Sequence, residues 1–261
     1  MSFRDAFQKY INNPEKYDIV DYHDENVIII KDMFPKATRH LLVIPRNPQL
    51  TKTHPLDAFN KNYKEYTGEE LYDMVSDYVE KAKDMIADEL LKYSELQSKE
   101  QLQEFRNTFI QAGVHSIPSL NNLHVHVITQ DFHSSRLKNK KHYNSFTTKF
   151  FVPFDELNPL HNEKYMMLNK KGEEYDSDSD NSELSIATPS FIKHERSKEK
   201  LEAIIKNTPF KCTSCSKTFG NSMVKLKEHL AMEYTKKYEK LIDPSVLEPN
   251  GFNLDKLPET K

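Results

Sequence analysis

The sequence has only two cysteines, no long apolar run and no marked excess of either charge. The cysteines, Cys212 and Cys215, lie three positions apart, which excludes a disulfide framework and favours a reducing compartment. No apolar run approaches the ~20 residues that a membrane-spanning helix needs, and the charged N-terminus has no signal-peptide core. We therefore expect a soluble intracellular protein with no membrane partner.

Charge and composition leave nucleic-acid binding open and indicate segments of different kinds. The 37 basic and 40 acidic residues give a net charge of −3, so the distribution of charge must decide about nucleic acid. The composition changes after about Pro159, and Lys171–Ser185 is acidic with almost no apolar side chain, which is typical of a disordered linker. We predict four segments: a folded domain (1–155), this linker (156–198), a cysteine-containing module (199–242) and a flexible tail (243–261).

Short strands with helices between them predict an α+β domain built on an antiparallel sheet. An apolar stripe from Phe3 to Ile11 predicts an N-terminal helix. A second helix is expected over about Leu56–Leu91, followed by a loop or helix extension over Lys92–Glu104. The expected strands lie within Asp18–Tyr22, Val27–Lys31, Arg39–Pro45, Phe105–Ser116, Asn121–Thr129 and Lys149–Phe154.

The stretch "NLHVHVITQDF" (122–132) places two histidines in one of these strands. Because side chains alternate along a strand, Asn122, His124 and His126 share one face, and the apolar residues between them share the other. The apolar set can pack on the core, while the polar set lines a cleft or meets solvent. Ordinary surface histidines, a metal site and a catalytic pair all fit this pattern, although the metal site lacks an obvious third ligand nearby.

The residues around these histidines resemble a known family. "LHVHVITQDF" resembles the histidine-triad motif in its aprataxin form, and "HSIPSLNNLHVHVITQDF" followed by "LKNKKHYNSF" is similar to that family's catalytic strand and basic loop. "IKDMFPKATRHLLVIPR" resembles its earlier strand–turn–strand segment. The resemblance covers most of residues 1–152 and resumes at the cysteines. We expect a short form without the N-terminal phosphopeptide-binding domain of longer aprataxins.

The resemblance implies a nucleophile and a substrate pocket. His124, at the middle position of the motif, would attack the phosphorus of an adenylate to form an adenylyl-histidine, from which water releases AMP. His126 would stabilise charge or handle a proton at the leaving group. Asn122 replaces the first histidine of the motif, and it can form hydrogen bonds but cannot titrate. The positions that line the family's pocket are matched by Lys36, His40, His115, Ser119 and Asn122.

The substrate implied by the resemblance is DNA whose 5′ end carries AMP through a pyrophosphate, as abortive ligation leaves it. This places the protein in DNA single-strand break repair, as a monomer in the nucleus, with the cytoplasm as a second location. Catalysis would need no metal. The basic segment Ser134–Ser145 is a solvated loop or a phosphate-binding one. The residues expected to bind DNA are Lys138, Lys140, Lys141 and His142.

The cysteine segment "CTSCSKTFGNSMVKLKEHLAMEY" resembles a zinc finger in which a turn is followed by a helix. Cys212, Cys215 and His229 are the expected ligands of one structural zinc ion. Glu233 lies one helical turn after His229, where a second histidine is common, and is our choice of fourth ligand. A redox-active Cys-x-x-Cys pair is the alternative.

The sequence thus predicts a two-part DNA deadenylase, and two other classes compete with it. One is a non-catalytic nucleic-acid-binding protein that uses the finger and the basic segment. The other is a metal-dependent enzyme that uses the histidine pair. It would bind a second metal ion, and that ion would remain bound after the finger is removed. If the two parts are separable, truncation after about residue 155 should spare hydrolysis of small adenylates and impair activity on DNA, provided that the shorter domain folds.

Overall fold

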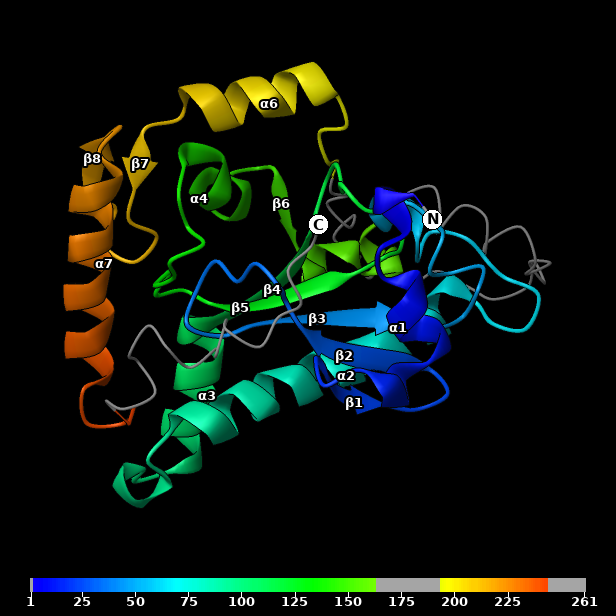
Figure 1. Ribbon diagram of the computed structural model, residues 1–261, viewed down its shortest axis with the longest axis horizontal. Helices are drawn as coiled ribbons and strands as arrows, with labels where there is room; N and C mark the ends of the chain where they lie inside the picture. The colour runs from blue at the N-terminus through cyan, green and yellow to red at the C-terminus, as the bar shows by residue number, and fades with distance from the viewer. Residues whose placement is uncertain (1, 163–192, 244–261) are drawn as a thin grey trace, which may run out of the picture.

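The computed structural model describes residues 2–162 and 193–243, and within them it has a six-stranded antiparallel sheet (Figure 1). The spatial order of the strands is β1-β2-β3-β5-β4-β6. Their bounds are β1 (Val20–His23), β2 (Val27–Lys31), β3 (His40–Pro45), β4 (Ile110–His115), β5 (Val125–Thr129) and β6 (Phe151–Pro153). The predicted α+β class on an antiparallel sheet is confirmed.

Different helices cover the two faces of the sheet (Figure 1). The long helix α2 (Gly68–Leu90) packs on the face that carries Ile29 and Val43. The short helix α1 (Gln8–Asn12) packs on the other face, which carries Ile30 and Leu42. Because alternate residues of one strand fall in the two cores, β2 and β3 are buried on both sides.

Helix α2 begins later than the sequence pattern predicts. The prediction placed its start near Leu56, but Pro55–Asp57 form a 3₁₀ turn and the helix begins at Gly68. Thr67 and Glu70 form a capping box, in which each side chain accepts a hydrogen bond from the other residue's backbone N–H. The capping box therefore sets the start of the helix at Gly68, although the apolar periodicity of the sequence extends further toward the N-terminus.

Two further segments differ from the prediction. Lys99–Phe109 forms helix α3, capped by Ser98, so the strand expected from Phe105 begins only at Ile110. Phe105 and Phe109 lie four residues apart and bury the same side of α3, a helical spacing that the strand assignment overlooked. The basic segment is not a loop throughout, because helix α4 (Lys140–Thr147) begins after the N-cap Asn139.

The cysteine-containing module forms a helix, a hairpin and a second helix, and the hairpin and second helix pack onto the sheet domain (Figure 1). Its elements are α6 (Lys198–Asn207), β7 (Phe210–Lys211), β8 (Thr218–Gly220) and α7 (Met223–Tyr238). The rings of Tyr234 and Tyr238 on α7 lie 4.9–5.5 Å from those of Phe105 and Phe109 on α3, centre to centre. The finger and the sheet therefore share one hydrophobic core.

Helix α6 is tied to α4 as well. The Asn144 amide donates to the carbonyls of Ile205 and Thr208, and so satisfies the C-terminal end of α6. Leu201 packs against Phe150. Before the gap, Leu157 is buried in a 3₁₀ turn, so ordered structure continues past residue 155.

The division into four segments stays a prediction. Most of the expected acidic linker and tail, residues 163–192 and 244–261, lies outside the described residues. No helix in the described part of the chain is long and apolar enough to cross a membrane.

Candidate active site

Three neighbouring strands bring four histidines to the α1 side of the sheet. His40 begins β3, His115 ends β4, His126 lies in β5 and His124 immediately precedes it. The order β3-β5-β4 places these residues side by side, and the ring of His126 lies 5.1 Å from His40, 4.5 Å from His115 and 5.0 Å from His124. The predicted alternation is confirmed, since Val125 and Val127 pack in the core on the α2 side.

A backbone carbonyl fixes the His124 ring. Its Nδ1 lies 2.8 Å from the carbonyl oxygen of Asn122. A carbonyl oxygen can only accept, so Nδ1 carries the proton and Nε2 keeps its lone pair. Phe7 packs edge-on against the ring at 5.2 Å. The arrangement holds a neutral imidazole whose Nε2 can act as a nucleophile.

A second chain of hydrogen bonds sets the tautomer of His126. The backbone N–H of Lys36 donates to Nδ1 of His40 at 3.3 Å, so the His40 proton lies on Nε2. That Nε2 is 2.9 Å from Nδ1 of His126, which must accept. The proton of neutral His126 therefore lies on its Nε2, which is buried and has no hydrogen-bond partner among the described residues. His126 can donate this N–H to a substrate oxygen.

Burial keeps the four histidines neutral. It lowers the pKa of His40 to about 4 and the pKa of His115 to about 3. Burial also lowers the pKa of His124 and of His126 from the usual value, because it disfavours the charged ring. The nucleophile and its neighbours are therefore uncharged at neutral pH, as a nucleophilic mechanism requires.

The same pKa values predict a loss of stability in mild acid. Unfolded histidines bind protons below about pH 6.5, whereas folded His40 and His115 stay neutral until about pH 4 and 3. The unfolded state thus binds more protons in this window, and each histidine lowers the unfolding free energy by about 1.4 kcal/mol per pH unit as pH falls. Urea unfolding at a series of pH values measures the slope. His115→Phe should make it shallower, and an unchanged slope would contradict the burial of a neutral His115.

Basic side chains border the histidine cluster. Burial lowers the pKa of His142, and the nearby charges of Lys36, Lys138 and Lys141 lower it further. Lys36 and Lys141 also contribute to the lowered pKa of His115. Lys138 and Lys141 are exposed at the start of α4. Lys140, in contrast, donates to Asn221 of the finger at 2.7 Å. The structure therefore brings two of the predicted DNA-binding lysines, Lys138 and Lys141, to one rim with His142, while Lys140 contacts the finger.

Two of the predicted pocket residues lie differently from the expectation. Ser119 is exposed on the segment between β4 and β5, and no hydrogen bond joins it to the cluster among the described contacts. The Asn122 side chain turns to Thr51 and Lys52, so Asn122 orients His124 through its backbone and not through its amide.

Sequence reasoning missed Asp32 and Phe146. The Asp32 carboxylate lies 3.5 Å from Nδ1 of His40. The Phe146 ring packs against His40, His115 and His126 at 4.7–5.5 Å. Asp32 could have been predicted as a site residue, because it stands four residues before Lys36 in the stretch "IKDMFPKATRHLLVIPR", which resembles the family. Phe146 likewise ends the quoted block "LKNKKHYNSF", but its contact with the histidines depends on how α4 packs against the sheet.

Asp32, His40 and His126 also form a group whose ligand atoms lie within 4.8 Å of one another. It contains His126 but not His124, so it is a different group from the histidine pair on which the metal-site alternative rests. However, His40 already uses both ring nitrogens, toward the Lys36 N–H and toward His126. A metal ion bound here would replace that hydrogen-bond chain.

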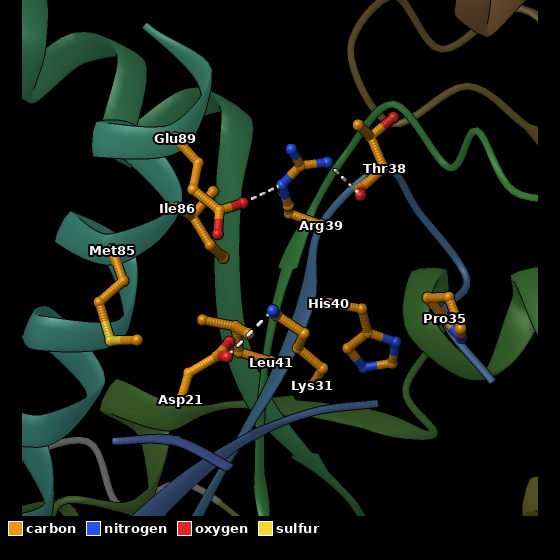
Figure 2. A pocket seen from close by; sticks show the side chains of 10 residues that line it. All are labelled: Asp21, Lys31, Pro35, Thr38, Arg39, His40, Leu41, Met85, Ile86 and Glu89. Carbon is orange, nitrogen blue, oxygen red and sulfur yellow. Dashed lines mark hydrogen bonds and ion pairs between the residues drawn. The ribbon is translucent and has the colours of Figure 1, made fainter. Parts of the chain in front are cut away.

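A cavity of about 200 Å³ lies on the α2 side of the sheet, under the turn between β2 and β3 (Figure 2). Asp21 and Lys31 form an ion pair of 3.0 Å in its wall, and Arg39 pairs with Glu89. Figure 2 shows the His40 ring turned toward Pro35, away from these pairs. His40 also lines this cavity, so the cavity adjoins the histidine cluster at that residue.

The four predicted zinc ligands come together from the hairpin and α7. Sγ of Cys215 lies 3.2 Å from Nε2 of His229, which is 2.5 Å from the Glu233 carboxylate. Sγ of Cys212 lies 3.5 Å from the same carboxylate, and all four ligand atoms lie within 4.8 Å of one another. Two sulfurs, a nitrogen and an oxygen that converge in this way fit a tetrahedral zinc ion.

Glu233→Ala is expected to weaken zinc binding less than Cys212→Ser, because a carboxylate is a weaker structural ligand for zinc than a thiolate. Competition with a chromogenic chelator measures the affinity. Glu228→Ala, an exposed position on the same helix, is the matched control and should bind zinc as the wild type does. Equal zinc affinity in Glu233→Ala and the wild type would remove Glu233 from the ligand set.

Comparisons with known proteins match both parts of the chain. Residues 4–142 match the family described as scavenger mRNA decapping enzyme C-term binding, and residues 147–236 match the C2HE / C2H2 / C2HC zinc-binding finger. An aprataxin-like protein of Saccharomyces cerevisiae is 35% identical over 92% of this chain and 99% of its own length.

Two solved structures resemble the fold. The crystal structure of the aprataxin ortholog Hnt3 in complex with DNA matches with a TM-score of 0.66 and 34% identity, covering 92% of this chain and 98% of the other. Hnt3 in complex with DNA and guanosine matches with a TM-score of 0.62 and 31% identity, over 92% and 99% of the two chains. The likeness extends through the sheet and the finger together.

Proposed function

Since the chain belongs to the aprataxin family, which are enzymes of the histidine-triad superfamily, we propose that it removes AMP from 5′-adenylated DNA ends left by abortive ligation. The observation that carries this proposal is His124, a buried neutral imidazole whose Nδ1 is held by the Asn122 carbonyl at 2.8 Å. The relatives add support, because the titles of two similar structures name DNA, and one names guanosine.

In the first step, Nε2 of His124 attacks the phosphorus of the adenylate. A bond forms between phosphorus and nitrogen, and the pyrophosphate P–O bond breaks, with the DNA 5′-phosphate as leaving group. The His126 Nε2–H donates to an oxygen on phosphorus as charge develops there. Lys36, at the rim, adds positive charge beside the leaving phosphate.

In the second step, water attacks the phosphorus of adenylyl-His124 and loses a proton to bulk solvent. The P–N bond breaks, AMP leaves, and Nε2 of His124 regains its lone pair. The Nδ1–H bond to the Asn122 carbonyl is present throughout, and it stabilises the positive charge that the ring carries while Nε2 is bonded to phosphorus. Neither step requires a metal ion.

The finger has a structural role in this proposal. One zinc ion would be held by Cys212, Cys215, His229 and Glu233, and it would fix the hairpin on α7. The protein would act as a monomer in single-strand break repair, in the nucleus and also in the cytoplasm.

Incubation of the protein with 5′-adenylated DNA tests the function directly. We expect stoichiometric release of AMP and a 5′-phosphate on the DNA, without added metal. DNA with an ordinary 5′-phosphate is the control and should yield no AMP. Binding without AMP release would favour the non-catalytic alternative, and activity that requires a second, chelatable metal would favour the metal-dependent one.

The basic rim predicts how DNA affinity depends on salt. Each lysine that contacts a phosphate adds about one unit to the slope of log affinity against log salt. We therefore expect Lys138→Ala/Lys141→Ala to weaken DNA binding at low salt and to lower that slope by about two units. Lys64→Ala, at an exposed position remote in sequence from this rim, is the control. An unchanged slope would mean that these lysines do not contact DNA. Titration of labelled DNA at several salt concentrations gives the values.

A further inference from the structure

Asn122 stands at the first position of the histidine motif, and it is 1% exposed. Its Nδ2 donates to the Thr51 hydroxyl at 3.2 Å, and its Oδ1 accepts from the Lys52 ammonium at 3.5 Å. The neighbouring Leu123 N–H donates to the Thr51 carbonyl at 2.6 Å. The motif is therefore bound to the segment that follows β3.

Lys52 extends this connection to the N-terminus. Its ammonium lies 3.1 Å from Oδ1 of Asp5, and the same oxygen accepts from the Asn121 amide at 3.0 Å. Bonds to Asn121 and Lys52 lower the pKa of Asp5, so the carboxylate is charged at neutral pH. The Asn121 backbone N–H donates to the Arg4 carbonyl at 2.7 Å. Residues 4 and 5 are thus fastened beside the histidine motif.

The fastened segment forms one wall of the His124 site. Phe7 is 8% exposed, and its ring meets that of His124 at an interplanar angle of 69°. Tyr10 and Ile11 of α1 pack with it on the strand residues of this face. The His124 ring is therefore held by its hydrogen bond to the Asn122 carbonyl on one side and by Phe7 of the N-terminal segment on the other.

We propose that Asn122 and Lys52 are positioning residues, which hold the N-terminal segment (residues 2–12) against His124 through Asp5. They do not touch the reacting atoms. Their effect is to keep the Phe7 ring on the imidazole, so that Nε2 stays directed at the adenylate and water is excluded from that side. The effect on rate rests on the proposed function, whereas the effect on the segment does not.

Kinetics on a small adenylate such as AMP-lysine tests the effect on rate, because this substrate has no DNA backbone for Lys52 to contact. We expect Lys52→Met and Asp5→Asn each to lower kcat about tenfold, since small misplacements of a reacting group cost about this much or more. The double variant should be no slower than either single one, because both break one connection. Lys52→Arg can donate to the same oxygens, those of Asp5 and Asn122, and should keep most of the wild-type kcat. Lys16→Met, an exposed lysine near the same end of the chain, is the matched control.

Hydrogen exchange of residues 2–12 tests the connection without reference to activity. Lys52→Met and Asn122→Ala should speed exchange in this segment while the unfolding midpoint of Lys52→Met stays that of the wild type. Unchanged exchange would overturn the connection. Faster exchange with unchanged kcat would overturn the positioning role. If the wild type releases no AMP, the proposed function fails. The hydrogen-exchange rates of residues 2–12 then still support or overturn the link from Asn122 and Lys52 to the N-terminal segment.

Discussion

His124→Ala is expected to lower the rate of AMP release to below about one hundredth of the wild-type rate. Nucleophile replacements remove the covalent route altogether, so the expected loss is larger than that of any positioning residue. The fold should survive, because the lost ring lies at the margin of the α1-side core and the removed hydrogen bond is local, to Asn122 two residues away. Release of AMP from adenylated DNA under single-turnover conditions measures the effect.

The controls for His124→Ala separate chemistry from binding and folding. DNA affinity should stay close to that of the wild type, because the basic rim is intact. His23→Ala, an exposed histidine on β1, should keep full activity. A His124→Ala protein that keeps more than a few per cent of the wild-type rate would move the nucleophile to another histidine of the cluster.

Truncation after residue 155 is expected to abolish activity on small adenylates as well as on DNA. The sequence suggested two separable parts, but Phe105, Phe109 and Tyr143 are at most 1% exposed and pack against residues 201–242. Each large apolar side chain that becomes exposed costs about 1.5–3 kcal/mol. Three of them approach the whole stability of a typical domain, which is about 5–15 kcal/mol. Circular dichroism melting and AMP-lysine hydrolysis measure the two losses.

A chain that ends at residue 243 is the control for this truncation, because it keeps every contact that the structure describes. Cys212→Ser should act in the same direction as the truncation, since loss of zinc loosens the hairpin that places α7 on α3. If the chain ending at residue 155 melts as the wild type does and hydrolyses AMP-lysine, the shared core is not essential and the finger serves DNA binding alone.

The sequence by itself determined the local parts of the candidate site. Alternation along a strand placed His124 and His126 on one face, and the structure agrees because the apolar residues between them have a core to enter. The Cys212, Cys215, His229 and Glu233 spacing likewise brought four ligand types together, since a hairpin and one helical turn are short-range structures. Both patterns depend on residues within about twenty positions of one another.

The tertiary structure alone decided which distant groups complete the site. His40 and His126 are 86 positions apart, and only the strand order β3-β5-β4 makes them hydrogen-bond neighbours. Asn122 was expected to line the substrate pocket, but burial beside Thr51 and Lys52 directs its amide to the segment that follows β3. Packing of α7 on α3 turned an expected separate finger into part of the core. Periodicity describes one element at a time, whereas these contacts depend on where several elements meet, and that is set by packing of the whole chain.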